Sequence, residues 1–174
     1  VDMWVEQAIR QGEAKIYEPE DEIEGYNPPG HFEAVRPLLL SGRLRELIDK
    51  GIKYIWISNI DNLGATIEPA ILGLLEKTGK DVLVELAEKY VGDAGGAPAN
   101  VNGRMQLVEQ FAFPQGFNQE KLPDFNTATY VIKTDALLKM FNLTVDELRT
   151  LSQNELERKV KEVVERIPIY AVMK

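Results

Sequence analysis

The run IKYIWIS at residues 52–58 constrains the fold most, because it is almost continuously apolar, β-branched or aromatic. A run of this kind and length is typical of a central β-strand that is covered on both faces. It is followed at once by a polar cluster in which Asn59, Asp61 and Asn62 lie close together. Such a cluster is either a turn, whose Asx side chains bond the local backbone, or a ligand site. The spacing alone favours neither interpretation.

Strand-like and helix-like segments alternate along the chain. Apolar or alternating runs predict strands, whereas apolar residues at helical spacing between a capping residue and a glycine predict helices. The expected strands are residues 14–18, 52–58, 81–91, 104–113, 127–133 and 167–174. The expected helices are residues 3–12, 41–51, 66–79 and 134–142, and two more that Thr144 and Ser152 open through the capping boxes TVDE and SQNE.

Capping residues define the ends of three of these helices. Ser41 and Thr66 are the expected N-caps of the second and third helices, which Gly51 and Gly79 end, and Thr134 is the expected cap of the fourth. The residues expected on buried helix faces are Leu44, Leu47, Ile48, Ile67, Ile71, Leu74, Leu75, Leu156, Val160, Val163 and Val164.

Strands and helices that mix through the whole length are typical of an α/β domain. The 174 residues are enough for one domain with a hydrophobic core. In open α/β sheets, ligands bind beyond the carboxyl ends of the strands, which is where Asn59 and Asp61 are expected on one side. An aspartate there can hold Mg²⁺, which is usually bound by one or two carboxylates together with substrate phosphates and water.

Composition excludes several classes of function. The net charge of -8 argues against nucleic acid or an anionic membrane as the main partner. The absence of cysteine excludes disulfides, thiolate zinc sites and cysteine nucleophiles, and the single histidine, His31, excludes a multi-histidine metal site within one chain. The sequence contains neither a membrane-length apolar run nor a signal peptide, so the expected location is the cytoplasm.

Other polar or glycine-rich segments are ambiguous when taken alone. In NPPGH, two prolines stiffen the backbone before Gly30 and His31, although a loop histidine is more often an ordinary surface residue. Residues 92–103, GDAGGAPANVNG, match no phosphate-binding pattern and favour a hairpin-like connection. Glu109 and Asn126 fit the polar tips of ordinary strands equally well.

Taken together, these segments resemble one family. NPPGH, then ISNIDNLGAT, then GG with GRMQLVEQ, then FNTATYVI follow the order and approximate spacing of UDP-glucose pyrophosphorylases, over about residues 25–135. This group of UTP–glucose-1-phosphate uridylyltransferases includes the UDP-sugar and UDP-N-acetylhexosamine pyrophosphorylases. The resemblance implies a Rossmann-like nucleotidyltransferase fold, with a mixed, mostly parallel sheet flanked by helices. It also implies Mg²⁺-dependent transfer of a uridylyl group from UTP to a sugar 1-phosphate, which releases pyrophosphate.

The resemblance also implies roles for single residues. Gly30 would contact the nucleotide and His31 the sugar phosphate, while Asp61 would be the catalytic residue that binds the metal and the UTP phosphates. Glu109 and Asn126 would hydrogen-bond the sugar hydroxyls. The other implied substrate contacts are Asn59, Ile60, Gly95, Gly96 and Thr127.

The chain also departs from the family pattern. Phe32, Ala94 and Ala128 stand where the family usually has Gly, Lys and Asn. The N-terminal phosphate loop and the later C-terminal region of the family are absent, so residues 1–174 are expected to be the central part of a catalytic domain, completed by a second copy or another chain segment. The alternatives are a catalytically inactive sugar-nucleotide-binding relative or fragment, and a plain α/β domain whose polar strand ends are only turns.

Overall fold

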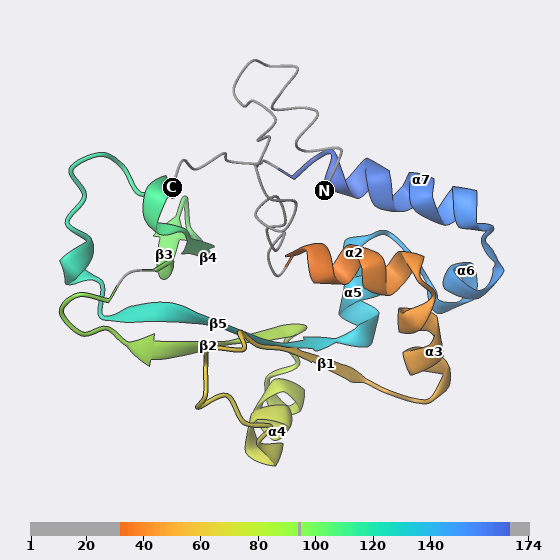
Figure 1. The fold of residues 1–174 in the computed structure, drawn as a ribbon, viewed down its shortest axis with the longest axis horizontal. Helices are drawn as coiled ribbons and strands as arrows, with labels where there is room; N and C mark the ends of the chain where they lie inside the picture. The colour runs from red at the N-terminus through yellow and green to blue at the C-terminus, as the bar shows by residue number, and fades with distance from the viewer. Residues whose placement is uncertain (1–31, 94, 168–174) are drawn as a thin grey trace, which may run out of the picture. The chain divides into compact units, whose positions relative to one another are not determined.

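The computed structural model describes residues 32–93 and 95–167, which form two compact units (Figure 1). One unit is Ile52–Ala136, and the other contains residues 32–51 and 137–167. No helix in these described ranges is both long and apolar enough to cross a membrane.

The unit Ile52–Ala136 is built on two antiparallel sheets. Its strands are β1 (Tyr54–Ile57), β2 (Val82–Glu88), β3 (Ala97–Val101), β4 (Arg104–Val108) and β5 (Asp124–Lys133). The three-stranded sheet has the order β1-β5-β2, and β3 pairs with β4. The predicted mixture of helices and strands is confirmed, but the described strands all pair antiparallel, so a mostly parallel sheet is not seen among them.

The expectation that residues 52–58 form a central, doubly covered strand is wrong for the described part of the sheet. β1 pairs with β5 alone, with Tyr54 opposite Lys133, and all four of its residues are half-buried. The central strand is β5, in which Thr129 and Val131 are buried. An apolar run indicates how much of a strand is covered, whereas the order of strands depends on contacts between distant segments.

The β3–β4 hairpin lies in and beyond the predicted glycine-rich turn. Asn102 and Gly103 connect the strands with φ angles of 51° and 81°, as a two-residue type I′ turn requires. The predicted hairpin-like connection is therefore confirmed. Strand β3 was not predicted, because Pro98 argues against a central strand although it is tolerated at an edge.

α4 (Pro69–Thr78) is attached to the three-stranded sheet through Glu76. The Tyr54 hydroxyl donates to Glu76 Oε1 at 2.5 Å, and the Lys133 ammonium lies 3.6 Å from the same oxygen. The hydrogen bond from Tyr54 lowers the pKa of Glu76, and the same bond raises the pKa of Tyr54. Two 3₁₀ turns, η2 (Gln110–Ala112) and η3 (Gln119–Lys121), precede β5.

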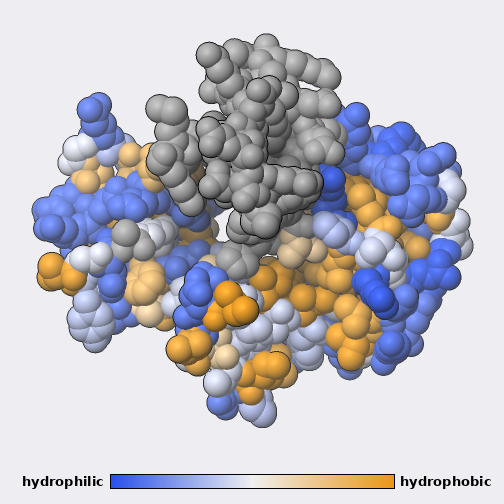
Figure 2. Space-filling view, viewed as in Figure 1, coloured by the Kyte–Doolittle hydropathy of each residue, from blue (hydrophilic) through white to orange (hydrophobic). Residues whose placement is uncertain are grey.

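Two of the four residues predicted for the apolar face of residues 66–79 are exposed. Leu75 is buried, but Leu74 is 51% exposed and Ile67, which precedes the helix, is 70% exposed. Ile60 and Leu63, in the loop between β1 and α4, are 90% and 94% exposed. Figure 2 shows the apolar surface over α4 and this loop. The prediction that Ile67 and Leu74 are buried is therefore wrong.

The other unit is helical. It contains α2 (Phe32–Leu40), α3 (Arg43–Asp49), α6 (Val145–Thr150) and α7 (Gln153–Val164), and α5 (Thr134–Met140) runs into it from the first unit. Its core is made by Val35, Leu39, Leu44, Leu137, Leu138, Phe141, Leu143, Leu148, Leu156, Val160 and Val164. Of the residues predicted for the buried face of α7, the last three of these are buried, whereas Val163 is half-buried.

Both predicted capping boxes are present. The Thr144 hydroxyl accepts from the Glu147 backbone amide, and the Glu147 carboxylate accepts from the Thr144 amide. Ser152 and Glu155 make the same reciprocal pair at the start of α7. These boxes could be predicted because every partner lies within four consecutive residues.

Two other predicted caps are wrong. α3 begins after Gly42, whose φ is 77°, so Ser41 is not its N-cap. α4 has Glu68 as its N-cap and Pro69 at its first position, where proline is favoured, so the helix begins beyond Thr66.

Thr134 does not act as the predicted cap of α5. Its buried hydroxyl donates to the carbonyl oxygens of Ile52 and Lys53 at 3.2 and 3.3 Å, and its backbone amide donates to Lys53 at 2.9 Å. Thr134 therefore joins the beginning of the unit Ile52–Ala136 to its end. Gly79, with a φ of 64°, ends α4 as predicted.

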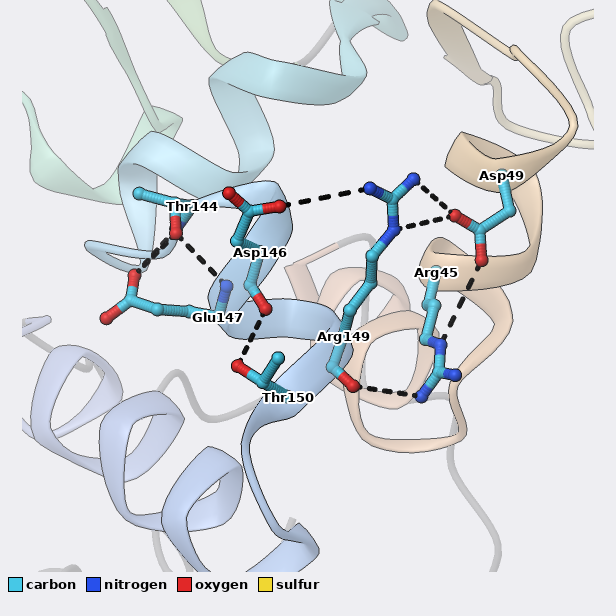
Figure 3. A network of polar contacts seen from close by, with 7 residues as sticks. All are labelled: Arg45, Asp49, Thr144, Asp146, Glu147, Arg149 and Thr150. Atoms are coloured by element: carbon cyan, nitrogen blue, oxygen red, sulfur yellow. Dashed lines mark hydrogen bonds and ion pairs between the residues drawn. The ribbon is translucent and has the colours of Figure 1, made fainter.

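An ion-pair network joins α6 to α3 (Figure 3). Arg149 Nε and Nη2 lie 2.9 and 2.6 Å from Asp49 Oδ1, and Arg45 donates to the Arg149 carbonyl oxygen at 3.5 Å. The side chains are about half exposed, so each pair contributes at most about 1 kcal/mol.

The predicted helix at residues 3–12 and the predicted strand at residues 14–18 lie outside the described residues, as does residue 168 onward of the last predicted strand. α2 was not predicted, because Pro37 stands inside it and breaks the helical signal.

Candidate functional site

The loop after β1 combines a turn with an exposed carboxylate. The Asn62 backbone amide donates to the Asn59 carbonyl oxygen at 3.1 Å, and the Asn59 side chain accepts a long bond of 3.5 Å from the Asp61 amide. Asp61 and Ile60 nevertheless have exposed side chains. The turn interpretation of this polar cluster is therefore confirmed, whereas a ligand site at the exposed Asp61 carboxylate stays a prediction.

The Asn62 side chain fixes the loop to the sheet. Its Nδ2 donates to Glu85 Oε2 on β2 and to Thr129 Oγ1 on β5, each at 3.1 Å. The Thr129 hydroxyl also lies 3.3 Å from that of Ser58. These groups are partly buried, so the bonds are shielded from competing water. Asn62 therefore supports the turn that carries Asn59 and Asp61.

A second group of predicted residues gathers where the end of β4 and the start of β5 meet the segment leading into β3. The Asn126 amide donates to the Gly96 carbonyl oxygen at 2.7 Å. A Cβ on Gly96 would lie only 3.2 Å from both carboxylate oxygens of Glu109, and Gly95 lies beside Phe125. The structure thus brings together Gly96, Glu109 and Asn126, which the sequence separates widely.

Thr127 lies at an irregularity in the β2–β5 ladder. Between the pairs Val84–Tyr130 and Leu86–Asn126 the register shifts, so several residues of β5 oppose Glu85. Ala128, within this bulge, has a φ of 58°, a left-handed conformation that alanine adopts rarely. The bulge turns Thr127 toward β2, where its hydroxyl lies 2.8 Å from Glu85 Oε2.

Within the described ranges, no three or more histidine or carboxylate side chains lie close enough together to hold a metal ion. The exposed Asp61 carboxylate fits the mode of Mg²⁺ binding in which the protein supplies one or two carboxylates and the substrate phosphates supply the rest. The side chains present therefore fit Mg²⁺ only together with a phosphorylated ligand.

Comparison with known proteins identifies the family. The family model described as UTP–glucose-1-phosphate uridylyltransferase matches residues 9–167. The chain belongs to this family. The match covers every predicted site residue, and the resemblance found in the sequence is confirmed.

Relatives in the uridylyltransferase family share about a third of the aligned residues. The UTP–glucose-1-phosphate uridylyltransferase of Saccharomyces cerevisiae is 32% identical over 124 residues, which are 68% of this chain and 25% of the yeast protein. The enzyme of the same name from Musa acuminata is 32% identical over 123 residues, which are 26% of its own length. The chain therefore spans about a quarter of the length of these relatives.

Solved structures of the family are also similar. A UDP-glucose phosphorylase from Trypanosoma brucei matches 78% of this chain with a TM-score of 0.65 and 30% identity, over 31% of its own chain. A variant of the Leishmania major UDP-glucose pyrophosphorylase, in complex with UDP-glucose, matches 80% with a TM-score of 0.60 and 25% identity, over 36% of its chain.

The predicted site residues have different outcomes. Gly30, His31 and Ala94 lie outside the described residues. The described substrate residues all fall in the unit Ile52–Ala136, in the loop after β1 and in the group around Gly96. Their roles in uridylyl transfer stay predictions.

Two residues that contact the loop after β1 were not predicted, namely Thr129 and Glu85, of which Glu85 also contacts Thr127. Glu85 is a half-buried charge between Val84 and Leu86 in an otherwise apolar stretch of strand. A lone carboxylate in such a position needs hydrogen-bond partners, and this was the signal available in the sequence. Thr129 gave no comparable signal, because threonine is ordinary in strands.

Proposed function

We propose that the chain forms part of an enzyme that transfers a uridylyl group from UTP to a sugar 1-phosphate. An oxygen of the sugar phosphate would attack the α-phosphorus of UTP, forming the new P–O bond as the bond to the β-phosphate breaks. The products are a UDP-sugar and pyrophosphate. The attacking oxygen is already anionic, so the step needs positioning and charge stabilisation more than proton transfer.

One observation carries this proposal. In a chain of the uridylyltransferase family, the loop with Asp61 and the group with Gly96 lie in one unit, and Glu85 contacts side chains from both the loop and β5. A site that holds two phosphorylated substrates needs such a fixed relation between two sets of ligands. We further propose a Rossmann-like nucleotidyltransferase fold for the complete site, which the similarity to solved UDP-glucose pyrophosphorylases supports.

We assign the residues as follows. Asp61 would bind Mg²⁺, which neutralises phosphate charge when it is bound, and Asn59 and Ile60 would line the substrate site. Glu109 and Asn126 would hydrogen-bond the sugar hydroxyls. The other proposed contacts are Gly30, His31, Gly95, Gly96 and Thr127.

The experiment combines calorimetry and a pyrophosphate-release assay. The chain is titrated with UTP, UDP-glucose and glucose 1-phosphate, with and without Mg²⁺, and then supplied with UTP and glucose 1-phosphate together. Mg²⁺-dependent release that Asp61→Ala nearly abolishes, with an unchanged unfolding midpoint, would support the proposal. The control Asp146→Ala removes an exposed aspartate of α6 and should keep the wild-type rate. Normal release by Asp61→Ala would contradict the role of Asp61.

A second candidate is a sugar-nucleotide-binding relative without catalysis. It is favoured by Ala128, which departs from the family pattern inside the bulge next to Thr127. Binding of UDP-glucose without release of pyrophosphate, in a chain whose mass is confirmed, would favour this candidate. Absence of any affinity for the three ligands would contradict both.

The proposed partners are small phosphorylated molecules. The net charge of -8 supports these over nucleic acids and anionic membranes. A second copy of the chain or another chain segment would complete the site. The cytoplasmic location stays a prediction from the sequence.

A further inference from the structure

Glu85 lies in the middle of β2, opposite the bulge of β5. One of its carboxylate oxygens, Oε2, accepts from the Thr127 hydroxyl at 2.8 Å and from Asn62 Nδ2 at 3.1 Å. The Thr127 hydroxyl is also 3.2 Å from the Glu85 backbone carbonyl oxygen. Two different segments of the site are thus hydrogen-bonded to one oxygen atom.

These two segments carry the two groups of predicted substrate residues. Asn62 follows Asp61 and closes the turn, because its backbone amide donates a hydrogen bond to the Asn59 carbonyl oxygen. Thr127 follows Asn126, whose backbone amide donates a hydrogen bond to the Gly96 carbonyl oxygen. A shift of the Glu85 carboxylate would therefore move the metal side and the sugar side of the site relative to one another.

The contacts of Glu85 support a positioning role. Its Oε2 already accepts two donors, and hydrogen bonds to a charged acceptor are stronger than neutral ones. Asn62 is held a second time by Thr129, so the loop is attached to both β2 and β5. A carboxylate used in this way fixes two neighbouring segments of the protein relative to one another.

We propose that Glu85 is a positioning residue that sets the Asp61 loop at a fixed position relative to Asn126 and Thr127, and so determines affinity for the sugar nucleotide. The proposal rests on the proposed function for its ligand. The hydrogen bonds that carry it can be tested without any ligand.

The first experiment measures amide hydrogen exchange in the free chain. In Glu85→Ala, the Asn62 and Ala65 amides, which close the loop turns, should exchange about ten-fold faster than in the wild type, because the loop opens locally. In Glu85→Gln the exchange should return close to the wild-type rate, because the amide oxygen can accept the same two bonds. The control is Glu88→Ala, which removes an exposed glutamate from the same strand and should change neither amide.

The second experiment measures UDP-glucose affinity by calorimetry for the same variants. Glu85→Ala should bind about ten-fold more weakly, the loss expected from one or two hydrogen bonds, while Glu85→Gln stays within about three-fold of the wild type. If the wild type does not bind UDP-glucose, the proposed function fails, and the exchange experiment alone decides the role of Glu85.

Three results would overturn the proposal. Equal losses in Glu85→Ala and Glu85→Gln would mean that charge matters and hydrogen-bond acceptance does not. Wild-type exchange at Asn62 in Glu85→Ala would mean that the loop is held elsewhere. A uniform acceleration that includes the Val131 amide in the sheet would mean that Glu85 supports only the stability of the whole unit.

Discussion

The backbone amide of Asn126 donates a 2.7 Å hydrogen bond to the carbonyl oxygen of Gly96, which joins β5 to the segment entering β3. A side chain at Gly96 would press against Val108 and Glu109, which would have to shift to admit it. Two predicted substrate residues are therefore in direct contact through backbone atoms.

We expect Gly96→Ala to lower the free energy of unfolding by about 1–3 kcal/mol, the usual cost of overpacking. The added Cβ would lie 3.1 Å from the Val108 carbonyl oxygen and 3.2 Å from the Glu109 carboxylate. Urea unfolding measures the change. The control is Gly73→Ala in α4, where a Cβ meets nothing within 4 Å and should stabilise the helix by about 0.5–1 kcal/mol. Equal effects of the two substitutions would contradict the close packing around Gly96.

We expect Ala128→Gly to raise the free energy of unfolding by up to about 1 kcal/mol, because Ala128 has a left-handed φ of 58°. Ala128→Asn should act in the same direction, since asparagine tolerates this conformation. In β2, Ala87→Gly is the control and should destabilise by about 0.5–1 kcal/mol, because a strand alanine outside the left-handed region gains nothing from glycine. Destabilisation by both Ala128 variants would show that the bulge is not strained.

The free energy of unfolding should decrease at low pH because Glu147 becomes protonated. A hydrogen bond from Lys159, followed by those from Thr144, lowers the pKa of Glu147 from 4.5 to about 2. The stabilisation is complete above the unfolded-state pKa and is lost as the pH falls through the folded-state pKa, because the unfolded chain binds the proton first. The urea midpoint of the wild type should therefore fall between pH 4.5 and about 2.

Glu147→Gln tests this assignment, since it removes the titrating group. Its urea midpoint should depend less on pH over the same interval. The control Glu157→Gln removes an exposed carboxylate of α7 and should keep the wild-type slope. A slope in Glu147→Gln as steep as in the wild type would assign the acid sensitivity to other groups.

We expect Thr134→Val to lower the free energy of unfolding by about 0.5–1.5 kcal/mol, because it removes a buried hydroxyl that donates to two backbone carbonyl oxygens. The hydroxyl donates to Ile52 and Lys53. Chemical denaturation is the measurement. The control Thr78→Val removes an exposed hydroxyl that donates to Leu74, and it should change stability by less than about 0.5 kcal/mol. A loss of stability in Thr134→Val no larger than in Thr78→Val would contradict the importance of this contact.

The sequence predicted what depends on neighbouring residues. The capping boxes of Thr144 and Ser152 and the stop at Gly79 follow from residues a few positions apart, and all three are present. Ser41 and Thr66 were assigned as caps from residue type alone, and the structure uses Gly42 and Glu68 because backbone geometry and Pro69 decide where each helix begins. Residue type therefore predicts that a helix exists better than where it starts.

What depends on distant segments was not predictable. The antiparallel pairing of β1 with β5 joins residues far apart in the chain, so an apolar run could not reveal it. In the candidate site, the exposed position of Asp61 followed from its place after a strand. The Glu85 contacts did not, because they join three separate segments.

The hydrogen bonds of Thr134 also bear on how the order of segments along the chain could be changed. They hold the two ends of the unit Ile52–Ala136 side by side, at Ile52 and Lys53. A segment with adjacent ends can be joined by a short linker and opened elsewhere, for instance at the exposed turn between Asn102 and Gly103. The unit is thus a natural subject for circular permutation, in which the order of its strands along the chain changes while their pairing in space is kept.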